Sequence, residues 1–519
     1  MPASAFTHPA PVEVDLIVVG SGGGAMTGAL LAQRAGLSVV VLERTDRVGG
    51  TSAYSGGACW LPGSAVQQRA GIADSTEGAR TYLEAVLQPD DGWTPDGAKV
   101  EAFLAHAPVV VAELEAAGID FEWLPFPEYY DAPGRCPMGR SIQPTSIKRA
   151  ALPRDVAAVV RPPVERDRVG EEGRNTLTGG QALIARLAAA FLGAGGQICT
   201  GHTVRDLLTE TDVSGDKVVG VWALTEHGAV EVRARRGVLL GSGGFEGSEA
   251  RRDSHDTPGR VEWSMAPRGT NRGEPISAAL DAGAAVDWTG LGWFCPGLEQ
   301  PDGGGSFTLG FRSGLMVDGS GRRYGNESLP YDQFGRLMAA DPARIPSWFV
   351  FDSREGGRLP GIAMPEGDPA AHLEAGTWVR ADTLEELAEQ TGVPASALVT
   401  SVARFNGFCA TGVDEDFGRG SDEYDTFFTA GEGPNKALTG VEQAPFYAAR
   451  FVLSDLGTKG GVVTDTSGRA LRPDGSAVPR LYACGNAAAP MTGPYYPGPG
   501  APLGTAMVFA SLAVRDLVD

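Results

Sequence analysis

The first residues with an evident chemical use are a run of small residues near the start of the chain. Residues 20 to 25 read GSGGGA, which matches the G-x-G-x-x-G/A pattern of dinucleotide-binding turns. In that pattern Gly20 allows a tight turn and Gly22 lets the backbone approach a pyrophosphate. Gly23, Gly24 and the small Ala25 would open a helix whose N-terminal N–H groups and macrodipole attract the phosphates. This run therefore predicts dinucleotide binding.

The residues on either side of this run predict the elements that hold it. Residues 14 to 19 (VDLIVV) form a short apolar run, as in a buried parallel strand, and residues 26 to 36 (MTGALLAQRAG) follow with a helical pattern closed by a glycine. A second apolar run, residues 38 to 42, ends at Glu43, an acid 23 residues after the first glycine of the run. Glu43 is placed to accept hydrogen bonds from a ribose. This βαβ start fits either NAD or FAD.

The segment that follows Glu43 favours FAD. Residues 44 to 52 (RTDRVGGTS) place a second glycine pair and two hydroxyls just beyond the ribose acid, a pattern typical of flavoproteins that wrap a whole FAD in one nucleotide domain. Simple NAD enzymes usually repeat βα units at this point instead. We therefore predict FAD as the cofactor. The residues expected to contact it in this segment are Arg44, Gly50, Thr51, Ser52, Ser55, Gly56 and Gly57.

The remainder of the chain predicts that the nucleotide domain is split. Residues 181 to 196 predict a helix, and the strands after it form a small meander that ends in a glycine turn. Gly243 and Gly244 of this turn are also expected to contact the cofactor. Longer loops and mixed helices follow, among them DTLEELAEQTG, in which Asp382 and Glu385 have capping-box spacing. Hairpin, strand and helix patterns then return near the C-terminus. We predict an α/β protein with a Rossmann-like FAD-binding domain at residues 1–293 and 458–519 and an inserted α+β catalytic domain at residues 294–457.

The composition of the chain limits the kinds of molecule that we expect it to bind. Its 519 residues are 42% hydrophobic and 21% charged, typical of a globular protein with a large core. The net charge of −21 disfavours nucleic acid and anionic membranes but has no effect on a neutral apolar substrate. Six dispersed cysteines and six dispersed histidines predict reduced thiols and no metal site. Without a signal peptide or a run of about 18 apolar residues, we expect a cytoplasmic protein with no integral membrane segment. Loose membrane association stays open.

The tyrosines raise a separate question. GPYYPGPGAPLG, residues 493 to 504, fixes a tyrosine pair on a segment rich in proline and glycine. Taken alone, it fits a surface turn or a polyproline-type ligand for a partner protein. A second pair, Tyr129 and Tyr130, and the isolated Tyr331 are equally ordinary alone, because tyrosines are often half-buried packing residues with one hydrogen bond.

Seven stretches, spread from near residue 15 to near residue 510, carry a more specific signal. They are VVGSGGGAMTGA, GGTSAYSGG, FPEYYDAPGR, FCPGLEQPDG, GRRYGNESLPYDQFG, DLGTKGGVVTD and YYPGPGAPLGTAM. Together they resemble the 3-ketosteroid Δ1-dehydrogenases, FAD enzymes of the fumarate-reductase-like flavoprotein superfamily. The resemblance covers essentially the whole chain and is far more specific than the nucleotide pattern alone.

The resemblance implies a reaction and roles for particular residues. In that family the substrate is a flat 3-ketosteroid, and a C1–C2 double bond is introduced into its A ring. Tyr496 and the N–H of Gly500 would hold the C3 carbonyl oxygen. Tyr331 would remove a proton from C2 with support from Tyr129, and the flavin N5 would take the C1 hydrogen as hydride. An external electron acceptor, of which a quinone is one type, would reoxidise the flavin. Further FAD contacts implied by the resemblance are Gly485, Asn486, Pro502 and Leu503.

Three other functions remain open beside this one. Dicarboxylate enzymes of the superfamily need His and Arg clamps, because bidentate Arg suits a carboxylate. The corresponding positions here read FCPG, residues 294 to 297, and YYPG, residues 495 to 498, which disfavours a dicarboxylate. A ketosteroid desaturase acting at C4–C5 is a closer alternative, although Tyr496 and Gly500 match the Δ1 type. A non-enzymatic electron-carrier flavoprotein is the third.

Overall fold

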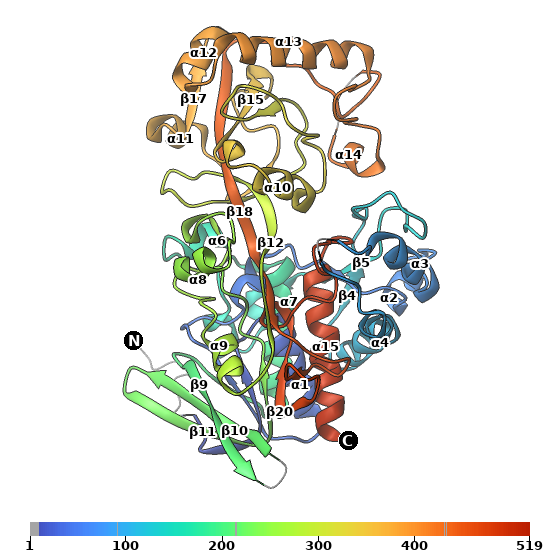
Figure 1. The fold of residues 1–519 in the computed structure, drawn as a ribbon, viewed down its shortest axis with the longest axis vertical. Coiled ribbons are helices and arrows are strands. Elements are labelled where there is room, and N and C mark those ends of the chain that lie inside the picture. The colour runs from blue at the N-terminus through green and yellow to red at the C-terminus, as the bar shows by residue number, and fades with distance from the viewer. Residues whose placement is uncertain (1–9, 91, 213–214, 430, 432) are drawn as a thin grey trace. The chain divides into compact units, whose positions relative to one another are not determined.

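The computed structural model describes residues 10–519 except residues 91, 213–214, 430 and 432, and these form two compact units (Figure 1). The first unit holds the described residues up to His255 together with Ala266–Gly290 and Thr458–Asp519, and the second holds Asp256–Met265 and Leu291–Gly457. The predicted boundaries differ from these units chiefly in residues 256–265, which were predicted within the FAD-binding domain. They pack with the second unit because the Met265 N–H donates to the Asp455 carbonyl at 2.9 Å, a tertiary contact that no local pattern reveals.

An eight-stranded sheet forms the centre of the first unit. Its order is β19-β20-β11-β1-β2-β8, with β20, β11, β1, β2 and β8 parallel, and β10 and β9 continue from β11 as antiparallel strands. This arrangement confirms the Rossmann-like α/β class and the meander that returns to the sheet. The strand bounds are β1 Glu13–Val19, β2 Val39–Leu42, β8 Gln197–Cys199, β9 Thr203–Asp212, β10 Gly215–Thr225, β11 Gly228–Leu240, β19 Arg469–Leu471 and β20 Ala477–Ala483.

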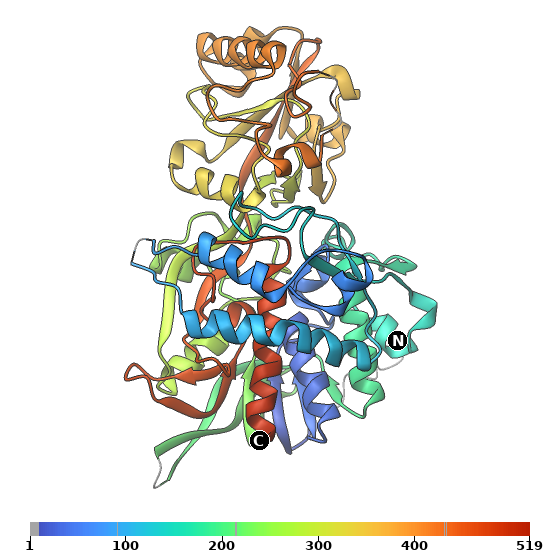
Figure 2. The same cartoon turned by 90° about the vertical axis from the view of Figure 1, so that its right-hand side faces the viewer.

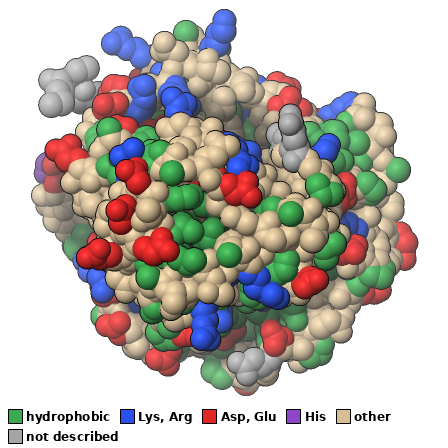
Figure 3. Space-filling view, turned by 90° about the horizontal axis from the view of Figure 1, so that it is seen from above, with side chains coloured by type: hydrophobic (Ala, Val, Ile, Leu, Met, Phe, Trp, Pro, Cys, Tyr) green, Lys and Arg blue, Asp and Glu red, His purple; other side chains and the backbone are tan. Residues whose placement is uncertain are grey.

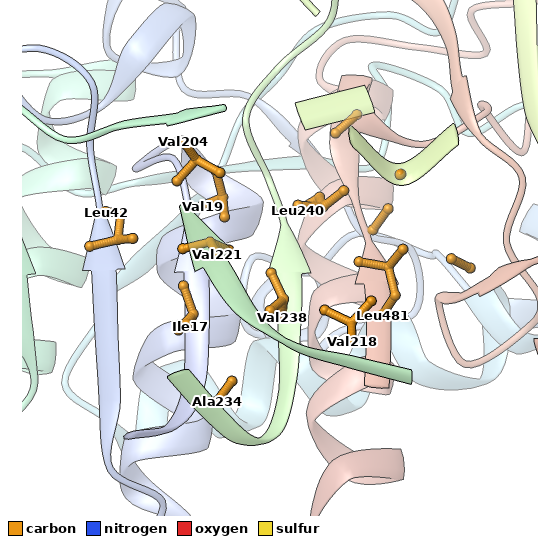
Figure 4. Close-up of a cluster of buried hydrophobic side chains, with 14 of the residues drawn as sticks. Ile17, Val19, Leu42, Val204, Val218, Val221, Ala234, Val238, Leu240 and Leu481 are labelled. Carbon is orange, nitrogen blue, oxygen red and sulfur yellow. The ribbon is translucent and has the colours of Figure 1, made fainter. Parts of the chain in front are cut away.

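Apolar side chains on these strands make the core of the first unit. The central strand β1 reads as a nearly continuous apolar run because both of its faces are covered, and Leu16, Ile17 and Val18 are fully buried. Figure 4 shows Ile17 in the same cluster as Val218 and Val221 from the antiparallel strand β10. Fully burying a Val, Ile or Leu side chain contributes roughly 1.5–3 kcal/mol, so this cluster is what fixes the sheet.

Helices cover the sheet, and one of them is unusually apolar. The main ones are α1 Gly23–Arg34, α4 Gly97–Ala116, α7 Gly179–Gly193 and α15 Ala501–Val518. α1 packs on both α7 and α15, and α4 crosses α15 (Figure 2). Within the described residues, α15 has the length and composition of a membrane-spanning helix, yet 56% of it is buried inside the protein. Packing in the core accounts for its apolar character.

Smaller elements complete the first unit. A three-stranded sheet has the order β3-β5-β4, and β6 pairs with β7. Their bounds, with those of the remaining helices and 3₁₀ turns, are β3 Cys59–Trp60, β4 Phe121–Trp123, β5 Ser141–Pro144, β6 Ile147–Lys148, β7 Thr176–Leu177, α2 Ala65–Arg69, α3 Thr76–Val86, α5 Arg154–Val159, α6 Val164–Asp167, α8 Glu249–Ser254, α9 Glu274–Asp281, η1 Gly50–Tyr54, η2 Arg149–Ala151 and η6 Gly485–Ala487.

The second unit is built on a five-stranded sheet of order β12-β18-β15-β14, with β17 also paired to β18. The long strands β12 and β18 contribute residues to both units. The core of the second unit is aromatic, with Phe311, Phe349 and Phe451 in mutual ring contact. The bounds are β12 Val286–Leu298, β13 Phe307–Leu309, β14 Leu315–Val317, β15 Ser347–Asp352, β16 Ile362–Met364, β17 Trp378–Ala381, β18 Phe446–Val462, α10 Tyr331–Ala339, α11 Pro369–Ala375, α12 Leu384–Thr391, α13 Ala395–Thr411, α14 Glu423–Phe427, η3 Val261–Trp263, η4 Pro342–Arg344 and η5 Ser353–Glu355.

The predicted capping box at the start of α12 is wrong by one residue. Thr383, not Asp382, is the N-cap, and its hydroxyl accepts a hydrogen bond from the Glu386 N–H at 3.2 Å. The Glu386 carboxylate accepts in return from the Asp382 N–H at 3.3 Å, so Glu385 is not the reciprocating acid. The pairs Asp382/Glu385 and Thr383/Glu386 both have the spacing of a capping box. In the structure Thr383 occupies the N-cap position.

The structure shows how the charged side chains are distributed and whether the cysteines are paired. Acidic and basic side chains are interspersed with hydrophobic ones on the face shown in Figure 3. All six cysteines lie in the described part of the chain and are free. Among the described residues, no cluster of His, Cys, Asp or Glu has the arrangement of a metal site.

Burial of His372 in the second unit makes stability depend on pH. Its ring stacks on Trp378, and burial lowers the pKa of His372 from 6.5 to about 4, against a weaker opposing effect of Asp368. Because the unfolded chain binds the proton more readily, this contribution to stability is complete above pH 6.5 and is lost as the pH falls towards 4. We expect the melting temperature of His372→Gln to fall less than that of the wild type between pH 7 and pH 4.5. A parallel fall in both proteins would contradict this.

Candidate active site

The glycine run forms the turn that the sequence predicts. Gly20 ends β1 with φ +93°, and a Cβ there would lie 2.6 Å from the Gly241 carbonyl oxygen, so only glycine fits. Gly22 is the extended N-cap of α1 and has no side-chain cap. Ala25 packs against the end of β11, where a Cβ on Gly241 would lie 2.7 Å from its own Cβ. The small side chain of Ala25 therefore allows close packing of the helix against the strand.

Unbonded N–H groups lie at the start of α1. The Gly23 N–H donates to Ser52 Oγ at 3.0 Å. Within the described residues, the N–H groups of Gly22, Gly24 and Ala25 donate no hydrogen bond to protein. Such groups at a helix N-terminus bind phosphates, with the helix dipole adding to the attraction. The residues present fit the pyrophosphate of a dinucleotide.

Glu43 is held in place by residues that the sequence analysis did not identify. Its carboxylate accepts from Ser21 Oγ at 2.5 Å and from the Thr45 N–H and Oγ1 at 2.9 and 3.0 Å. Ser21 Oγ also accepts from the Gly49 N–H at 2.9 Å, and Arg161 donates to Thr45 Oγ1 at 2.7 Å. Glu43 is 7% exposed, so its carboxylate has one fixed orientation for the predicted ribose contact. The signal for Ser21 was its position inside the glycine run.

The segment after Glu43 contains one ion pair and two glycines that have open space beside them. Arg44 makes two hydrogen bonds to the Glu274 carboxylate, at 3.0 and 3.2 Å, which gives it a structural partner within the protein. Thr51 Oγ1 accepts from Asn271 Nδ2 at 3.4 Å. A Cβ on Gly50 or Gly56 would meet no atom within 4 Å. Protein packing therefore does not require glycine at those two positions, and the space beside them is open.

The serines and the third glycine of this segment pack against the start of α7. The Gly180 N–H donates to the Ser55 carbonyl at 3.0 Å, and the Gly57 N–H donates to Ser55 Oγ at 3.1 Å. A Cβ on Gly57 would lie 2.4 Å from the Gly179 carbonyl carbon. Gly57 therefore has a packing role. Ser52, in the same segment, accepts a hydrogen bond from the first residue of α1.

A second glycine turn follows β11. Gly243 faces the Asn271 side chain, and Gly244 faces Thr458 and Glu246. The fully buried Glu246 carboxylate accepts from Asn271 Nδ2 at 2.5 Å and from the Thr458 N–H at 3.2 Å. The sequence analysis identified none of these three side chains, because they come from separate segments of the chain.

The start of α15 lies against the start of α1. A Cβ on Gly23 would lie 3.0 Å from Leu503 Cδ2, and one on Gly24 would lie 2.8 Å from the Ala506 Cβ. Pro502 has no N–H, and within the described residues the Leu503 N–H donates to no protein group. Two helix N-termini therefore meet here. Gly485 and Asn486 open the turn η6 shortly after β20, and a Cβ on Gly485 would lie 3.4 Å from the Ala506 Cβ of α15.

Three of the four predicted catalytic residues belong to the first unit. The rings of Tyr129 and Tyr496 meet edge to face with centroids 5.1 Å apart, and both residues are buried. The Tyr129 N–H donates to the Pro497 carbonyl at 3.1 Å. Gly500 is the N-cap of α15 with φ +82°, and a Cβ there would lie 2.1 Å from the Ala58 carbonyl oxygen. Within the described residues its N–H donates to no protein group.

The neighbouring tyrosines pack. Tyr495 contacts the rings of Trp93 and Tyr130, with centroids 6.0 and 6.2 Å apart. These contacts give Tyr495 a packing role, whereas the family resemblance singles out Tyr496.

Tyr331, the fourth predicted catalytic residue, belongs to the second unit. It is the first residue of α10 and is 5% exposed, with its ring edge to face against Phe307 at 4.7 Å. The loop before it is fixed by a fully buried ion pair, in which Arg419 Nη1 lies 3.0 Å from Glu327 Oε2. Asn326 Nδ2 donates to Asp425 at 2.8 Å. The residue is thus placed on a rigid loop-to-helix junction.

Replacing Ser21 with alanine should weaken cofactor binding. Ser21→Ala removes a hydrogen bond to the buried Glu43 carboxylate, and a bond to a charged group contributes about 1.5–3 kcal/mol, so we expect the Kd for FAD to rise about tenfold or more. Flavin fluorescence during titration of the apoprotein measures this. Ser476→Ala, which removes an exposed hydrogen bond to Asp474, is the control. Equal Kd values for the two variants would contradict the orienting role of Ser21.

Comparison with known proteins identifies the family of the chain. The FAD binding domain family matches residues 15–503. The 3-oxosteroid 1-dehydrogenase of Rhodococcus opacus is 40% identical over 97% of this chain and 98% of its own. The 4-oxocyclohexanecarboxylate 2-dehydrogenase of Sinomonas cyclohexanicum is 33% identical over 97% of this chain and 92% of its own. The crystal structure of 3-ketosteroid Δ1-dehydrogenase from Sterolibacterium denitrificans in complex with 1,4-androstadiene-3,17-dione is 30% identical over 98% of this chain and 100% of its own, with a TM-score of 0.89. The chain is an FAD-dependent oxidoreductase of the 3-oxosteroid 1-dehydrogenase family.

Proposed function

We propose that the protein introduces the C1–C2 double bond into the A ring of 3-ketosteroids. The observation that carries this proposal is the buried pair of Tyr129 and Tyr496 next to Gly500, whose N–H donates to no described protein group. Similarity over the full length to a 3-oxosteroid 1-dehydrogenase supports the same reaction.

The reaction depends on stabilising an enolate. A C2–H next to a ketone becomes acidic only when the developing negative charge on the C3 oxygen is stabilised. The Tyr496 hydroxyl and the Gly500 N–H act as the two donors. One such donor in a water-excluded site contributes about 2.7–4 kcal/mol to transition-state stabilisation. Gly500 also lies at the N-terminus of α15, where the helix dipole favours negative charge.

Tyr331 acts as the base that takes the proton from C2. A phenol is a weak base at neutral pH because its ordinary pKa is about 10, so the phenolate must be favoured by its surroundings. The family resemblance gives this role to Tyr129, because a hydrogen bond donated to a phenolate stabilises the charged form. FAD, when bound, supplies the two-electron acceptor that desaturation of a C–C bond requires.

The proposed catalytic residues come from both units of the chain. The first unit carries the FAD site and both oxyanion donors, and the second unit carries Tyr331. The protein acts in the cytoplasm, and an external acceptor, a quinone among the candidates, reoxidises the flavin.

The substrate can be identified by flavin reduction. We expect 4-androstenedione to bleach the yellow flavin absorbance under anaerobic conditions. This steroid already has its C4–C5 double bond, so flavin reduction by it cannot reflect C4–C5 desaturation. 4-Oxocyclohexanecarboxylate and succinate are the comparison compounds. If either reduces the flavin while several 3-ketosteroids do not, the assigned substrate class is wrong. A flavin that none of them reduces would favour an electron carrier.

Single hydroxyl deletions test the roles of the tyrosines. We expect Tyr496→Phe to lower kcat about 10²- to 10³-fold, because it removes one oxyanion donor. Tyr331→Phe should abolish most activity with FAD still bound, because it removes the base. Tyr495→Phe, next in the chain and engaged in ring packing, is the matched control and should retain kcat. Full activity in Tyr331→Phe would remove its role.

A further inference from the structure

The segment that carries Tyr496 and Gly500 is held through its carbonyl groups. Prolines at residues 494, 497 and 499 lack an N–H, so the carbonyls are the main backbone groups by which the rest of the unit can bind this segment. The segment has no regular secondary structure before Ala501. Its carbonyl contacts therefore determine where Tyr496 and Gly500 lie.

Four of these carbonyls have partners from distant parts of the first unit. Lys459 Nζ donates to Pro494 at 2.8 Å, and Ser141 Oγ donates to Pro499 at 2.6 Å. The Trp60 N–H donates to Gly500 at 3.2 Å. The Pro497 carbonyl accepts two hydrogen bonds, one from the Tyr129 N–H and one from Tyr82 Oη at 2.7 Å.

Tyr82 connects the two tyrosine segments. It lies on α3 with no exposed surface, and while its hydroxyl donates to Pro497 it accepts from the Tyr130 N–H at 3.2 Å. Desolvation by burial raises the pKa of Tyr82 well above its ordinary value, with the Glu128 charge acting in the same direction. The hydroxyl consequently keeps its proton, and with it the bond to Pro497, at any working pH.

The Tyr82 ring is itself fixed by a buried polar cluster. The Arg140 guanidinium lies 5.5 Å from the centroid of Tyr82 and 5.6 Å from that of Trp60, within cation–π range. Arg140 Nε lies 3.0 Å from Glu128, which also accepts from Trp60 Nε1 at 2.8 Å. Glu128 directly precedes Tyr129, and burial raises the pKa of Glu128 to about 7 against the opposing charge of Arg140. The cluster thus joins the support of Tyr82 to the chain that carries Tyr129.

We propose that Tyr82 is a positioning residue of the desaturation reaction: its hydroxyl sets the spacing between the Tyr129 segment and the oxyanion donors Tyr496 and Gly500. This inference rests on the proposed function. Tyr82 is not one of the four predicted catalytic residues, and it acts only through Tyr130 and Pro497. Without the Tyr82 hydroxyl, the Pro497 carbonyl would lose one of its two hydrogen bonds and keep the one from the Tyr129 N–H.

Tyr82→Phe tests this role, with Tyr482→Phe as matched control. Both variants remove a largely buried tyrosine hydroxyl. The Tyr82 hydroxyl makes two hydrogen bonds to the tyrosine segments, whereas the Tyr482 hydroxyl donates to Asp516 at 2.8 Å. We expect Tyr82→Phe to lower kcat about tenfold, as loss of about 1.4 kcal/mol of transition-state stabilisation would, with FAD content unchanged. Tyr482→Phe should keep kcat within twofold of the wild type.

A binding measurement separates positioning from general destabilisation. Estrone, whose phenolic 3-oxygen resembles the enolate, and 1,4-androstadiene-3,17-dione are titrated into each variant and followed by the flavin spectrum. Because the oxyanion donors favour the charged oxygen, we expect Tyr82→Phe to weaken estrone binding at least fivefold more than dienone binding. Equal weakening of both ligands, or a kcat equal to that of Tyr482→Phe, would overturn the inference.

Ser141→Ala covers the case in which Tyr82→Phe does not fold. It removes the hydrogen bond to Pro499 in the same segment, and the same preferential loss of estrone binding is expected. An unchanged ratio of the two Kd values in that variant would also overturn the inference. A wild-type protein whose flavin no 3-ketosteroid reduces would instead overturn the proposed function, and the inference with it.

Discussion

The close contact between α1 and α15 is the constraint on which the rest of the site depends. Small residues make it possible, because a Cβ on Gly24 would overlap Ala506. It brings together two helix N-termini, each with N–H groups that donate to no described protein group. One end suits the diphosphate of FAD, and the other, through Gly500, suits the enolate oxygen of the proposed reaction. This one packing contact therefore positions both helix N-termini that are suited to bind a negatively charged group.

The nucleotide site was largely predictable because its signals are local. The β1-α1-β2 start lies within 30 residues, so the positions of Gly20, Gly22 and Glu43 follow from a pattern read along the chain. What such a pattern cannot supply is the network around it. Asn271 and Thr458 reach Glu246 from segments far away in sequence, and each is ordinary by its own neighbourhood. The N-cap predicted for α12 was wrong for a different reason, because two adjacent residues both have the spacing of a capping box.

The tyrosines mark the limit of reasoning from residue types. Nothing in the chain around Tyr129 or Tyr496 distinguishes it from its neighbouring tyrosine, so their roles came only from the family resemblance. The structure separates them by geometry, with Tyr496 buried against Tyr129 and Tyr495 packed on Trp93. Tyr82 gave no sequence signal at all, because its importance lies in a carbonyl 415 residues farther along the chain.

That distance has a consequence for how the protein is made. The segment before α15 bonds to residues 60, 82, 129 and 141, and β20 pairs with β11, so segments made late in synthesis complete a site begun by much earlier ones. During translation the early strands and helices emerge without the element that covers them. Contacts so distant in sequence form slowly, and uncovered apolar surfaces aggregate. A chain that stops before α15 therefore lacks the helix that covers this core, and the start of α1 is left without its packing partner.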